Sequence, residues 1–353
     1  MSNCCSRSTS GVSDLSCLAR RDFVRQLAFG AGLVAATELV SRRAIAAGGN
    51  ATLGGEAYAR LNAASLVLLL EGQKKGSGAL VDSTGLAITA AHGIGQKGSR
   101  IEVLTARAER LRVEVVAVDL GHDLALLRLP AREGGYPFLP LATVTPKPGA
   151  EVFCFGTPGN MRMPVLLRGS IASDTLTFAY LGVDFIPSLT VSAHLPGGTS
   201  GSPWVDDQGV VFGVQSGVVS QHGISVGVAL ASPVAGVWRL LETRRNASTP
   251  NAGIVIADIL EQEQPHRSLF PVQAEGLFIT SVTPNGPAAR AGIKQWSLIL
   301  GAEAQPVRTI TEFFTLLRAK KPGDKFLTEI LEPGATTKRE VNITLGLLEA
   351  SWR

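Results

Sequence analysis

The chain has 353 residues, of which 45% are hydrophobic, so it is long enough for two or three domains with substantial cores. Its net charge at pH 7 is +4, and three of these charges lie in residues 1–46, so the near-neutral remainder argues against nucleic acid as the main partner. The 39 glycines, 19 prolines and few aromatic residues favour short strands and tight turns over long helices. The sequence therefore predicts a globular protein that is mainly β.

Residues 1–46 differ from the rest and predict an export signal. The pair Arg20-Arg21 precedes a modestly apolar run over 26–37, and the small-residue site Ala44-Ile-Ala46 ends the segment. A basic region, a short apolar stretch and such a site are typical of a secretory signal peptide, and the paired arginines resemble a bacterial twin-arginine signal. Glu38 interrupts the run, whereas a membrane anchor needs roughly 20 apolar residues. We expect cleavage after Ala46, a periplasmic or secreted product and no permanent membrane anchor.

Removing this segment changes the charge and the cysteine count. It carries three of the four net positive charges, so the mature chain is close to neutral. It also contains Cys4, Cys5 and Cys17, which leaves Cys154 alone in an alternating apolar run. We therefore expect no intrachain disulfide in the mature protein, and Cys154 is predicted to be a small buried hydrophobic residue.

Residues 51–242 are a succession of short apolar runs that predict strands. These strands are expected at 66–70, 78–81, 86–89, 101–106, 111–118, 124–129, 151–155, 165–172, 188–192, 209–216 and 224–230. Asp82-Ser-Thr-Gly85 predicts a hairpin turn between two of them. No helical period is evident before a closing helix at 233–242, and this pattern favours barrels or sandwiches.

A polar, charged segment at 243–250 ends in proline and predicts a linker. The unit that follows, 251–348, mixes strands and helices and predicts an α+β domain. Its strands are expected at 253–258, 276–282, 297–301, 326–331 and 339–345, and its helices at 287–291 and 310–320.

Three short segments carry residues suited to nucleophilic hydrolysis. This chemistry needs a hydroxyl, an imidazole to take its proton, a carboxylate to hold the imidazole, and donors for the oxyanion. Thr89-Ala-Ala-His92 follows a strand, Gly121-His-Asp-Leu-Ala-Leu-Leu127 opens one, and Gly197-Gly-Thr-Ser-Gly-Ser-Pro203 is a glycine-rich loop. Each alone is equally typical of a surface histidine, a turn aspartate or a tight loop. Their combination and order favour a serine hydrolase.

Residues 66–240 resemble the trypsin-like two-barrel serine proteases, specifically the HtrA/DegP type. The matching segments are Gly76–Val81, Leu86–His92, Asp119–Arg128, Gly156–Gly159, Gly198–Pro203 and Gly209–Val214. The resemblance implies a chymotrypsin-fold domain at 51–242 and a serine endopeptidase without a cofactor. In it His92 is the general base, Asp123 orients His92, and Ser200 is the nucleophile. The backbone N–H groups of Gly198, Thr199 and Ser200 would form the oxyanion hole.

The nucleophile loop departs from the family pattern, which has Asn before the serine and two glycines after it. Here Thr199, Gly201 and Ser202 stand at these positions, and we still expect activity. The resemblance places Leu195, Val226 and Val228 in the substrate pocket, which predicts cleavage after small aliphatic residues. His194 leaves open the alternative that the pocket favours an acidic side chain.

The other histidines show no metal-ligand spacing, and neither a His-Glu-x-x-His motif nor paired cysteines are present, so no metal site is expected. His122, His222 and His266 are interpreted as non-catalytic. His122 is the competitor for the role of base, but it directly precedes Asp123, and neighbouring side chains diverge along a strand.

Residues 251–348 resemble a PDZ domain of the bacterial protease type, in which the strand order is circularly permuted. The matching segments are Asn251–Ile254, Gly276–Val282, Gly286–Ile293 and the helix from Ile310. The resemblance implies that Asn251, Ala252, Gly253 and Ile254 form a loop that binds a chain-terminal carboxylate, with the peptide adding as a strand beside 254–258. A domain used only for assembly is the alternative.

Two functional hypotheses follow. The first is an endopeptidase of the cell envelope that degrades unfolded or mislocalised proteins and captures their hydrophobic C-termini. The second is a catalytically silent, chaperone-like pseudoprotease that binds peptides. The complete triad favours the enzyme. Homotrimers are common in the family, and the sequence leaves open whether Tyr58 and its neighbours build one.

Overall fold

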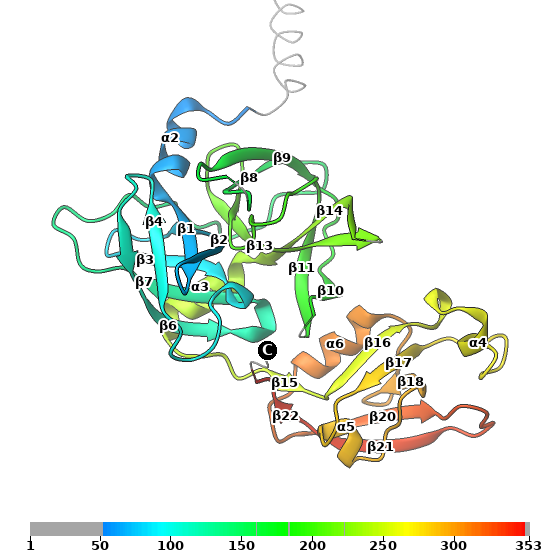
Figure 1. Cartoon of the computed structure of the whole chain (residues 1–353). Helices are drawn as coiled ribbons and strands as arrows, with labels where there is room; N and C mark the ends of the chain where they lie inside the picture. Colours follow the sequence, from blue (N-terminus) through cyan, green and yellow to red (C-terminus); the bar gives the residue numbers. More distant parts are fainter. Residues whose placement is uncertain (1–51, 160, 183, 222, 350–353) are drawn as a thin grey trace, which may run out of the picture. The chain divides into compact units, whose positions relative to one another are not determined.

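The structure, a computed structural model, describes residues 52–349 except 160, 183 and 222. The predicted export signal, with Arg20, Arg21 and Ala46, lies outside the described residues. Residues Ala51–Arg353 form one compact unit. Its described part is mainly β (Figure 1), as the composition predicts. Within these ranges, every helix is too short or too polar to span a membrane.

The first sheet has seven strands and curls into a barrel. They are β1 (Ser65–Leu70), β2 (Gln73–Leu80), β3 (Leu86–Ala90), β4 (Ile101–Thr105), β5 (Arg110–Arg112), β6 (Glu114–Asp119) and β7 (Leu124–Arg128). Their order is β5-β4-β1-β2-β3-β7-β6. The end strands β5 and β6 are separated in the chain by Val113 alone, so the sheet must bend round to bring its two edges together.

Two short 3₁₀ turns lie at one end of this barrel. The turn η1 (Ala91–Gly93) follows β3, and η2 (Leu120–His122) connects β6 to β7. Because β3 and β7 are neighbours and Ala90 pairs with Leu124, the two turns meet. Helix α3 (Val234–Thr243) packs its apolar face into the core of the same barrel.

The second sheet also has seven strands. They are β8 (Glu151–Gly156), β9 (Val165–Ile171), β10 (Thr177–Tyr180), β11 (Phe185–Ser192), β12 (Pro203–Val205), β13 (Val211–Gln221) and β14 (Ile224–Pro233). Strand β9 pairs with β8 and also with β11, which closes the sheet. Cys154 on β8 is fully buried in this core, which confirms the prediction that it is a buried hydrophobic residue.

The first regular element is a helix, and the expectation of no helical period before residue 233 is therefore wrong. Helix α2 (Gly55–Ala64) buries Ala57, Leu61 and Ala64. These residues recur at positions i, i+4 and i+7, so they lie on one face of a helix. Tyr58 on α2 is about half exposed and packs edge-on against Phe155 at 5.5 Å. The homotrimer stays a prediction.

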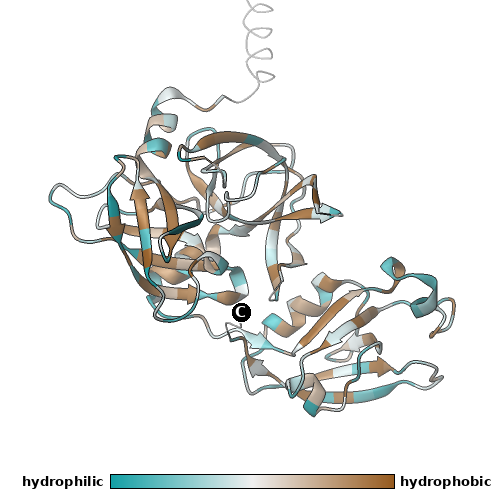
Figure 2. Ribbon diagram, in the orientation of Figure 1, coloured by the Kyte–Doolittle hydropathy of each residue, from teal (hydrophilic) through white to brown (hydrophobic). Residues whose placement is uncertain are grey.

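Residues 250–347, here called the C-terminal region, form a third sheet with helices beside it. Its elements are β15 (Pro250–Asn251), β16 (Ile254–Asp258), η3 (Ile259–Glu261), α4 (Gln264–Arg267), β17 (Leu277–Val282), α5 (Pro287–Arg290), β18 (Leu298–Ala302), β19 (Gln305–Pro306), α6 (Ile310–Arg318), β20 (Lys325–Leu331), β21 (Arg339–Thr344) and β22 (Gly346–Leu347). The main sheet has the order β16-β17-β18-β20-β21. Helix α6 begins with a capping box between Thr309 and Glu312. Apolar residues lie along the strands of all three sheets (Figure 2).

Two aromatic side chains of the second barrel complete the core of the C-terminal region. Phe185 at the start of β11 is buried and stacks on Phe314 of α6, with ring centroids 4.4 Å apart. Phe178 of β10 stacks on the same ring at 5.5 Å. The β10–β11 hairpin and α6 therefore share one hydrophobic cluster.

Candidate active site

The turns η1 and η2 bring His92 and Asp123 into direct contact. The ring nitrogen Nδ1 of His92 lies 2.8 Å from Oδ2 of Asp123, and the backbone N–H of His92 donates to Oδ1 at 2.9 Å. The N–H of Ala91 donates to the carbonyl oxygen of Asp123 at 3.0 Å. Asp123 adopts a left-handed conformation with φ 52°, which ends η2 and turns its carboxylate toward η1. Both carboxylate oxygens are thus engaged by one histidine, so its ring orientation is fixed.

The environment of His92 suits a general base. Asp123 is buried, whereas one third of the His92 side chain is exposed. Burial alone lowers the pKa of His92, but the hydrogen bond to Asp123 and the negative charge of its carboxylate outweigh burial and raise the pKa above its usual value. A hydrogen bond from Nδ1–H to Asp123 leaves Nε2 as the basic nitrogen.

Ser200 lies in the loop between β11 and β12, close to the turn that carries His92. The carbonyl oxygen of Ser200 accepts from the N–H of Ser77 at 2.8 Å. Gly201 lies so close to β3 that an added Cβ would come within 2.9 Å of the Ala90 nitrogen. The close approach of Gly201 to Ala90 therefore holds Ser200 near His92, since each lies one or two residues from this contact. In the described structure Ser200 Oγ makes no hydrogen bond to His92, as is common in enzymes without substrate.

The glycine-rich loop presents two free amide groups. The carbonyl oxygen of Gly197 accepts from the N–H of Gly159 at 2.7 Å. In a planar trans peptide the N–H points opposite to the carbonyl, so Gly198 N–H points away from Gly159. Gly198 has φ 93°, and an added Cβ would lie 2.5 Å from the Gly159 nitrogen, so glycine is required. Within the described residues, the N–H groups of Gly198 and Ser200 make no hydrogen bond. Such unpaired donors suit a developing oxyanion.

Thr199 braces this loop from inside. Its hydroxyl donates to the carbonyl oxygen of Pro196 at 2.8 Å, and its own carbonyl oxygen accepts from Ser202 N–H at 3.0 Å. The side chain of Thr199 is buried. Thr199 therefore helps to fix the turn around Ser200.

The predicted pocket residues lie at two positions. Leu195 is buried in the core of the second barrel. Val226 and Val228 lie on β14, flanking Gly227, and Val226 is exposed. His194 is exposed and lies against Gly227, where an added Cβ would meet its Nε2 at 2.9 Å. The choice between small aliphatic and acidic substrates stays a prediction.

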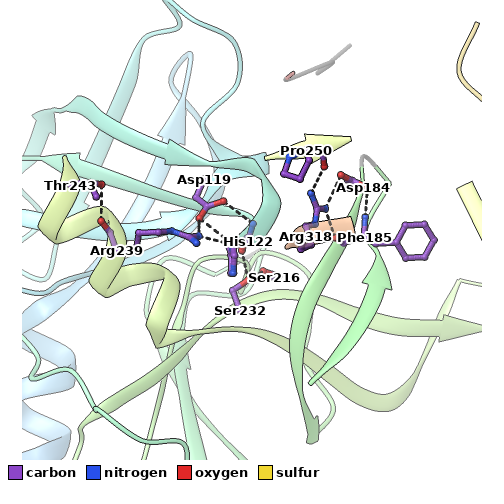
Figure 3. Close-up of polar contacts among 10 residues, drawn as sticks. All are labelled: Asp119, His122, Asp184, Phe185, Ser216, Ser232, Arg239, Thr243, Pro250 and Arg318. Atoms are coloured by element: carbon purple, nitrogen blue, oxygen red, sulfur yellow. Dashed lines mark hydrogen bonds and ion pairs between the residues drawn. The ribbon is translucent and has the colours of Figure 1, made fainter. Parts of the chain in front are cut away.

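His122 and Asp119 form a second histidine–aspartate pair at the turn η2, which Asp123 ends (Figure 3 draws this second pair). The Nδ1 atom of His122 lies 3.1 Å from Oδ2 of the fully buried Asp119. Arg239 of α3 bonds the same carboxylate oxygen and also lies 2.9 Å from His122 Nδ1. The expectation that His122 and Asp123 diverge along a strand is wrong in its reason, because His122 ends η2. The three side chains anchor the turn that presents Asp123.

The predicted carboxylate loop of the C-terminal region contacts the β10–β11 hairpin. Figure 3 shows the adjoining contacts of Arg318 with Asp184, Phe185 and Pro250. Asn251 Nδ2 donates to Asp184 Oδ2 at 3.3 Å, and its Oδ1 accepts from Gly253 N–H at 2.6 Å. Arg318 of α6 donates to the same Asp184 oxygen at 2.9 Å and to the carbonyl oxygen of Phe185 at 2.9 Å. Ala252 and Ile254, the other predicted loop residues, are buried. The loop therefore already lies beside a carboxylate, that of Asp184.

The structure adds residues that the sequence did not single out. All of them contact elements distant in sequence, and only Ser77 lies in a segment that matched the protease family: Lys74, Ser77, Asp184, Arg239 and Arg318. Among residues 52–349, outside the gaps, no group of three His, Cys, Asp or Glu side chains is placed to hold a metal ion.

Comparison with known proteins identifies the two barrels. Residues 76–214 match the family model described as "Trypsin-like peptidase domain". These residues are similar to trypsin-like peptidase domains. This match spans β2 to β13 and includes His92, Asp123 and Ser200.

The homologues are DegP-like serine endoproteases. A "Probable periplasmic serine endoprotease DegP-like" of Pseudomonas fluorescens is 25% identical over 282 residues, which cover 79% of this chain and 57% of that protein. "Protease Do-like 1, chloroplastic" of Arabidopsis thaliana is 26% identical over 303 residues, which cover 81% of this chain and 66% of that protein. The chain thus spans little more than half the length of the first relative that it matches.

Solved structures show the same fold. An HtrA-type protease, AlgW, with a decapeptide has a TM-score of 0.58 and 20% identity, covering 82% of this chain and 97% of that chain. A serine endoprotease from Yersinia pestis has a TM-score of 0.55 and 24% identity, and the likeness covers 83% of this chain and 97% of that chain. The likeness extends beyond the trypsin-like domain, because the peptidase match alone ends at residue 214.

Proposed function

We propose that this chain is an exported serine endopeptidase in which His92, Asp123 and Ser200 act together. One observation carries the proposal. A histidine oriented by a buried aspartate lies near a serine loop in which the N–H groups of Gly198 and Ser200 have no partner among the described residues. The trypsin-like match and the DegP-like homologues support the same reaction.

In the proposed reaction Ser200 Oγ attacks the scissile carbonyl carbon while His92 Nε2 takes its proton. Asp123 holds the ring and stabilises the imidazolium that forms. The N–H groups of Gly198 and Ser200 donate to the oxyanion, and one such donor contributes about 3–4 kcal/mol to the transition state. His92 then gives its proton to the leaving amine. Water next attacks the acyl carbon while His92 Nε2 takes its proton, and this proton returns to Ser200 Oγ as the bond to the acyl carbon breaks and the carboxylic acid leaves.

Labelling with a fluorophosphonate tests the nucleophile. We expect one adduct, located on Ser200 by peptide mapping, together with digestion of unfolded casein. The Ser200→Ala protein should show neither. Casein cut by that variant at the wild-type rate would contradict the proposal, and a wild-type protein without either signal would support the silent peptide-binding alternative. The residue before each cut in the digest distinguishes small aliphatic from acidic preference.

The proposed substrates are unfolded or mislocalised proteins of the cell envelope. Relatives named as periplasmic support this location, and the Arg20-Arg21 segment supports export through the twin-arginine route. Changing both arginines to lysine should leave the precursor in the cytoplasm. Efficient export of the double variant would exclude this route.

The C-terminal region is proposed to be a PDZ domain that captures hydrophobic chain ends. Support comes from Asn251 in the loop before β16 and Arg318 at the end of α6, which both bond the carboxylate of Asp184. A peptide terminus offers the same group. Fluorescence anisotropy on the Ser200→Ala protein should detect a peptide with a free hydrophobic C-terminus, while the amidated peptide should bind at least tenfold more weakly. Equal binding of both peptides would exclude recognition of the carboxylate.

A further inference from the structure

The ammonium group of Lys74 gathers three backbone carbonyls from a distant turn. Lys74 lies on β2, and the turn follows β8. Its Nζ donates to the carbonyl oxygens of Thr157 at 2.8 Å, of Pro158, and of Met161 at 3.1 Å. An ammonium carries three N–H donors and no acceptor, so these carbonyls use its whole capacity. Burial lowers the pKa of Lys74 below its usual value, because removal from water disfavours the charged form.

A β-bulge aims this side chain. In the pairing of β1 with β2, Leu68 lies opposite Gly76 and Leu69 opposite Lys74, so Lys75 is an extra residue. Without the bulge, Lys74 and Ser77 would face opposite sides of the sheet, because side chains alternate along a strand. The bulge changes this alternation and brings both residues to the same turn. Lys75 itself is exposed.

The turn held by Lys74 contacts the glycine-rich loop at two points. The hydroxyl of Ser77 accepts from Thr157 N–H at 2.9 Å and donates to the carbonyl oxygen of Gly198 at 3.1 Å. The N–H of Gly159 donates to the carbonyl oxygen of Gly197 at 2.7 Å. This second bond sets the plane of the Gly197–Gly198 peptide and hence the direction of Gly198 N–H.

We propose that Lys74 is a positioning residue for the oxyanion hole. By fixing the carbonyls of the turn it directs Gly159 N–H toward Gly197, and that bond keeps Gly198 N–H pointed at the site of the developing oxyanion. Glycines on both sides leave this peptide free to rotate, so an external constraint is needed. The proposal rests on the proposed serine peptidase function of the same site.

The Lys74→Met variant removes the ammonium group but keeps an unbranched side chain. Removing one oxyanion donor lowers kcat by about 10²–10³-fold, and indirect loss of its orientation should lower kcat by about 10–100-fold. KM for a short peptide substrate should stay within about twofold, because substrate binding precedes the charge that the donor stabilises. Lys75→Met is the matched control and should behave as wild type. Lys74→Arg, which restores donors, should recover part of kcat.

Equal kcat for Lys74→Met and Lys75→Met would overturn the proposal. The proposal would also be overturned if unfolded protein at the assay temperature accounted for the whole loss of kcat in Lys74→Met. Thermal unfolding of both variants measures that unfolded fraction. Amide hydrogen exchange gives a readout that needs no activity. We expect faster exchange at Gly159 N–H in Lys74→Met than in Lys75→Met, and unchanged exchange would also overturn the proposal. A wild-type protein that cleaves no peptide would refute the proposed function, while the exchange result would still decide the role of Lys74 in ordering the loop.

Discussion

Two histidine–aspartate pairs lie next to each other in this molecule, and only one faces a nucleophile loop. His92–Asp123 and His122–Asp119 each join a ring Nδ1 to a buried carboxylate. Both oxygens of Asp123 accept only from His92 among the described contacts, whereas Asp119 also pairs with Arg239. The pair alone therefore does not make a catalytic base. The surroundings distinguish the two pairs. Arg239 bonds the carboxylate of Asp119, which suits a structural role, whereas the Ser200 loop lies near His92, which suits a catalytic role.

The largest expected effect separates the two histidines. His92→Ala should lower kcat by about 10⁶-fold, the scale on which members of a triad act as a unit. His122→Ala should keep most of kcat, because the His122 ring contacts Asp119 and Arg239 and takes no part in the His92–Asp123 pair. Steady-state hydrolysis of one peptide by both variants provides the comparison. A loss for His122→Ala as large as that for His92→Ala would show that the roles were assigned wrongly.

The next effect concerns the carboxylate of the catalytic pair. Asp123→Asn should lower kcat by about 10⁴-fold, because the amide favours the wrong ring tautomer. His92 acts as a base only when unprotonated, so activity rises with pH through its pKa. Asp123 raises that pKa against the effect of burial. The acidic limb of the pH–kcat profile should therefore move to lower pH in the variant, and a limb that stays in place would contradict this coupling.

A smaller effect is expected at the anchoring pair. Burial raises the pKa of Asp119, but His122 and Arg239 outweigh it, and the net pKa is lowered. Arg239→Met should destabilise the fold by about 1–3 kcal/mol, since it leaves a buried carboxylate with one partner fewer.

The stability that the Asp119–Arg239 pair contributes should depend on pH, because folding lowers the pKa of Asp119. A depressed carboxylate pKa stabilises the fold above the unfolded pKa of about 3.9, and this stability is lost as pH falls through the folded pKa. The difference between wild type and Arg239→Met should thus be full at neutral pH and shrink under acid. Urea unfolding at several pH values measures it, with the exposed Arg245→Met as control. A difference that grows on acidification would be inconsistent with the charged pair.

The sequence predicted those parts of the fold that have a local pattern. Apolar runs anticipated β1, β3 and β7, and the helix at 310–320 appears as α6. His92 and Asp123 were singled out by their combination and order with Ser200 and by the resemblance to trypsin-like proteases, and the structure brings the two into contact. Helix α2 was missed although Ala57, Leu61 and Ala64 follow a helical spacing, because small residues give a weak signal.

The long-range contacts that support the candidate site could not be predicted from the sequence. Arg239 lies 120 positions from Asp119, and Lys74 lies 83 positions from Thr157. No period or motif links such residues, since their proximity arises only when the sheets close. The bulge at Lys75 is equally hidden, because one extra residue in a strand looks like ordinary sequence.

The buried Cys154 has a practical consequence for measuring motion of the β10–β11 hairpin with a thiol-linked label. It is the only cysteine among the described residues, and burial raises its pKa to about 12. Thiol reagents react with the thiolate, which is nearly absent there at neutral pH. After removal of residues 1–46 the chain therefore offers a silent background for maleimide chemistry. A single cysteine placed on an exposed position of the β10–β11 hairpin can carry a spin label or dye without first replacing the native thiol.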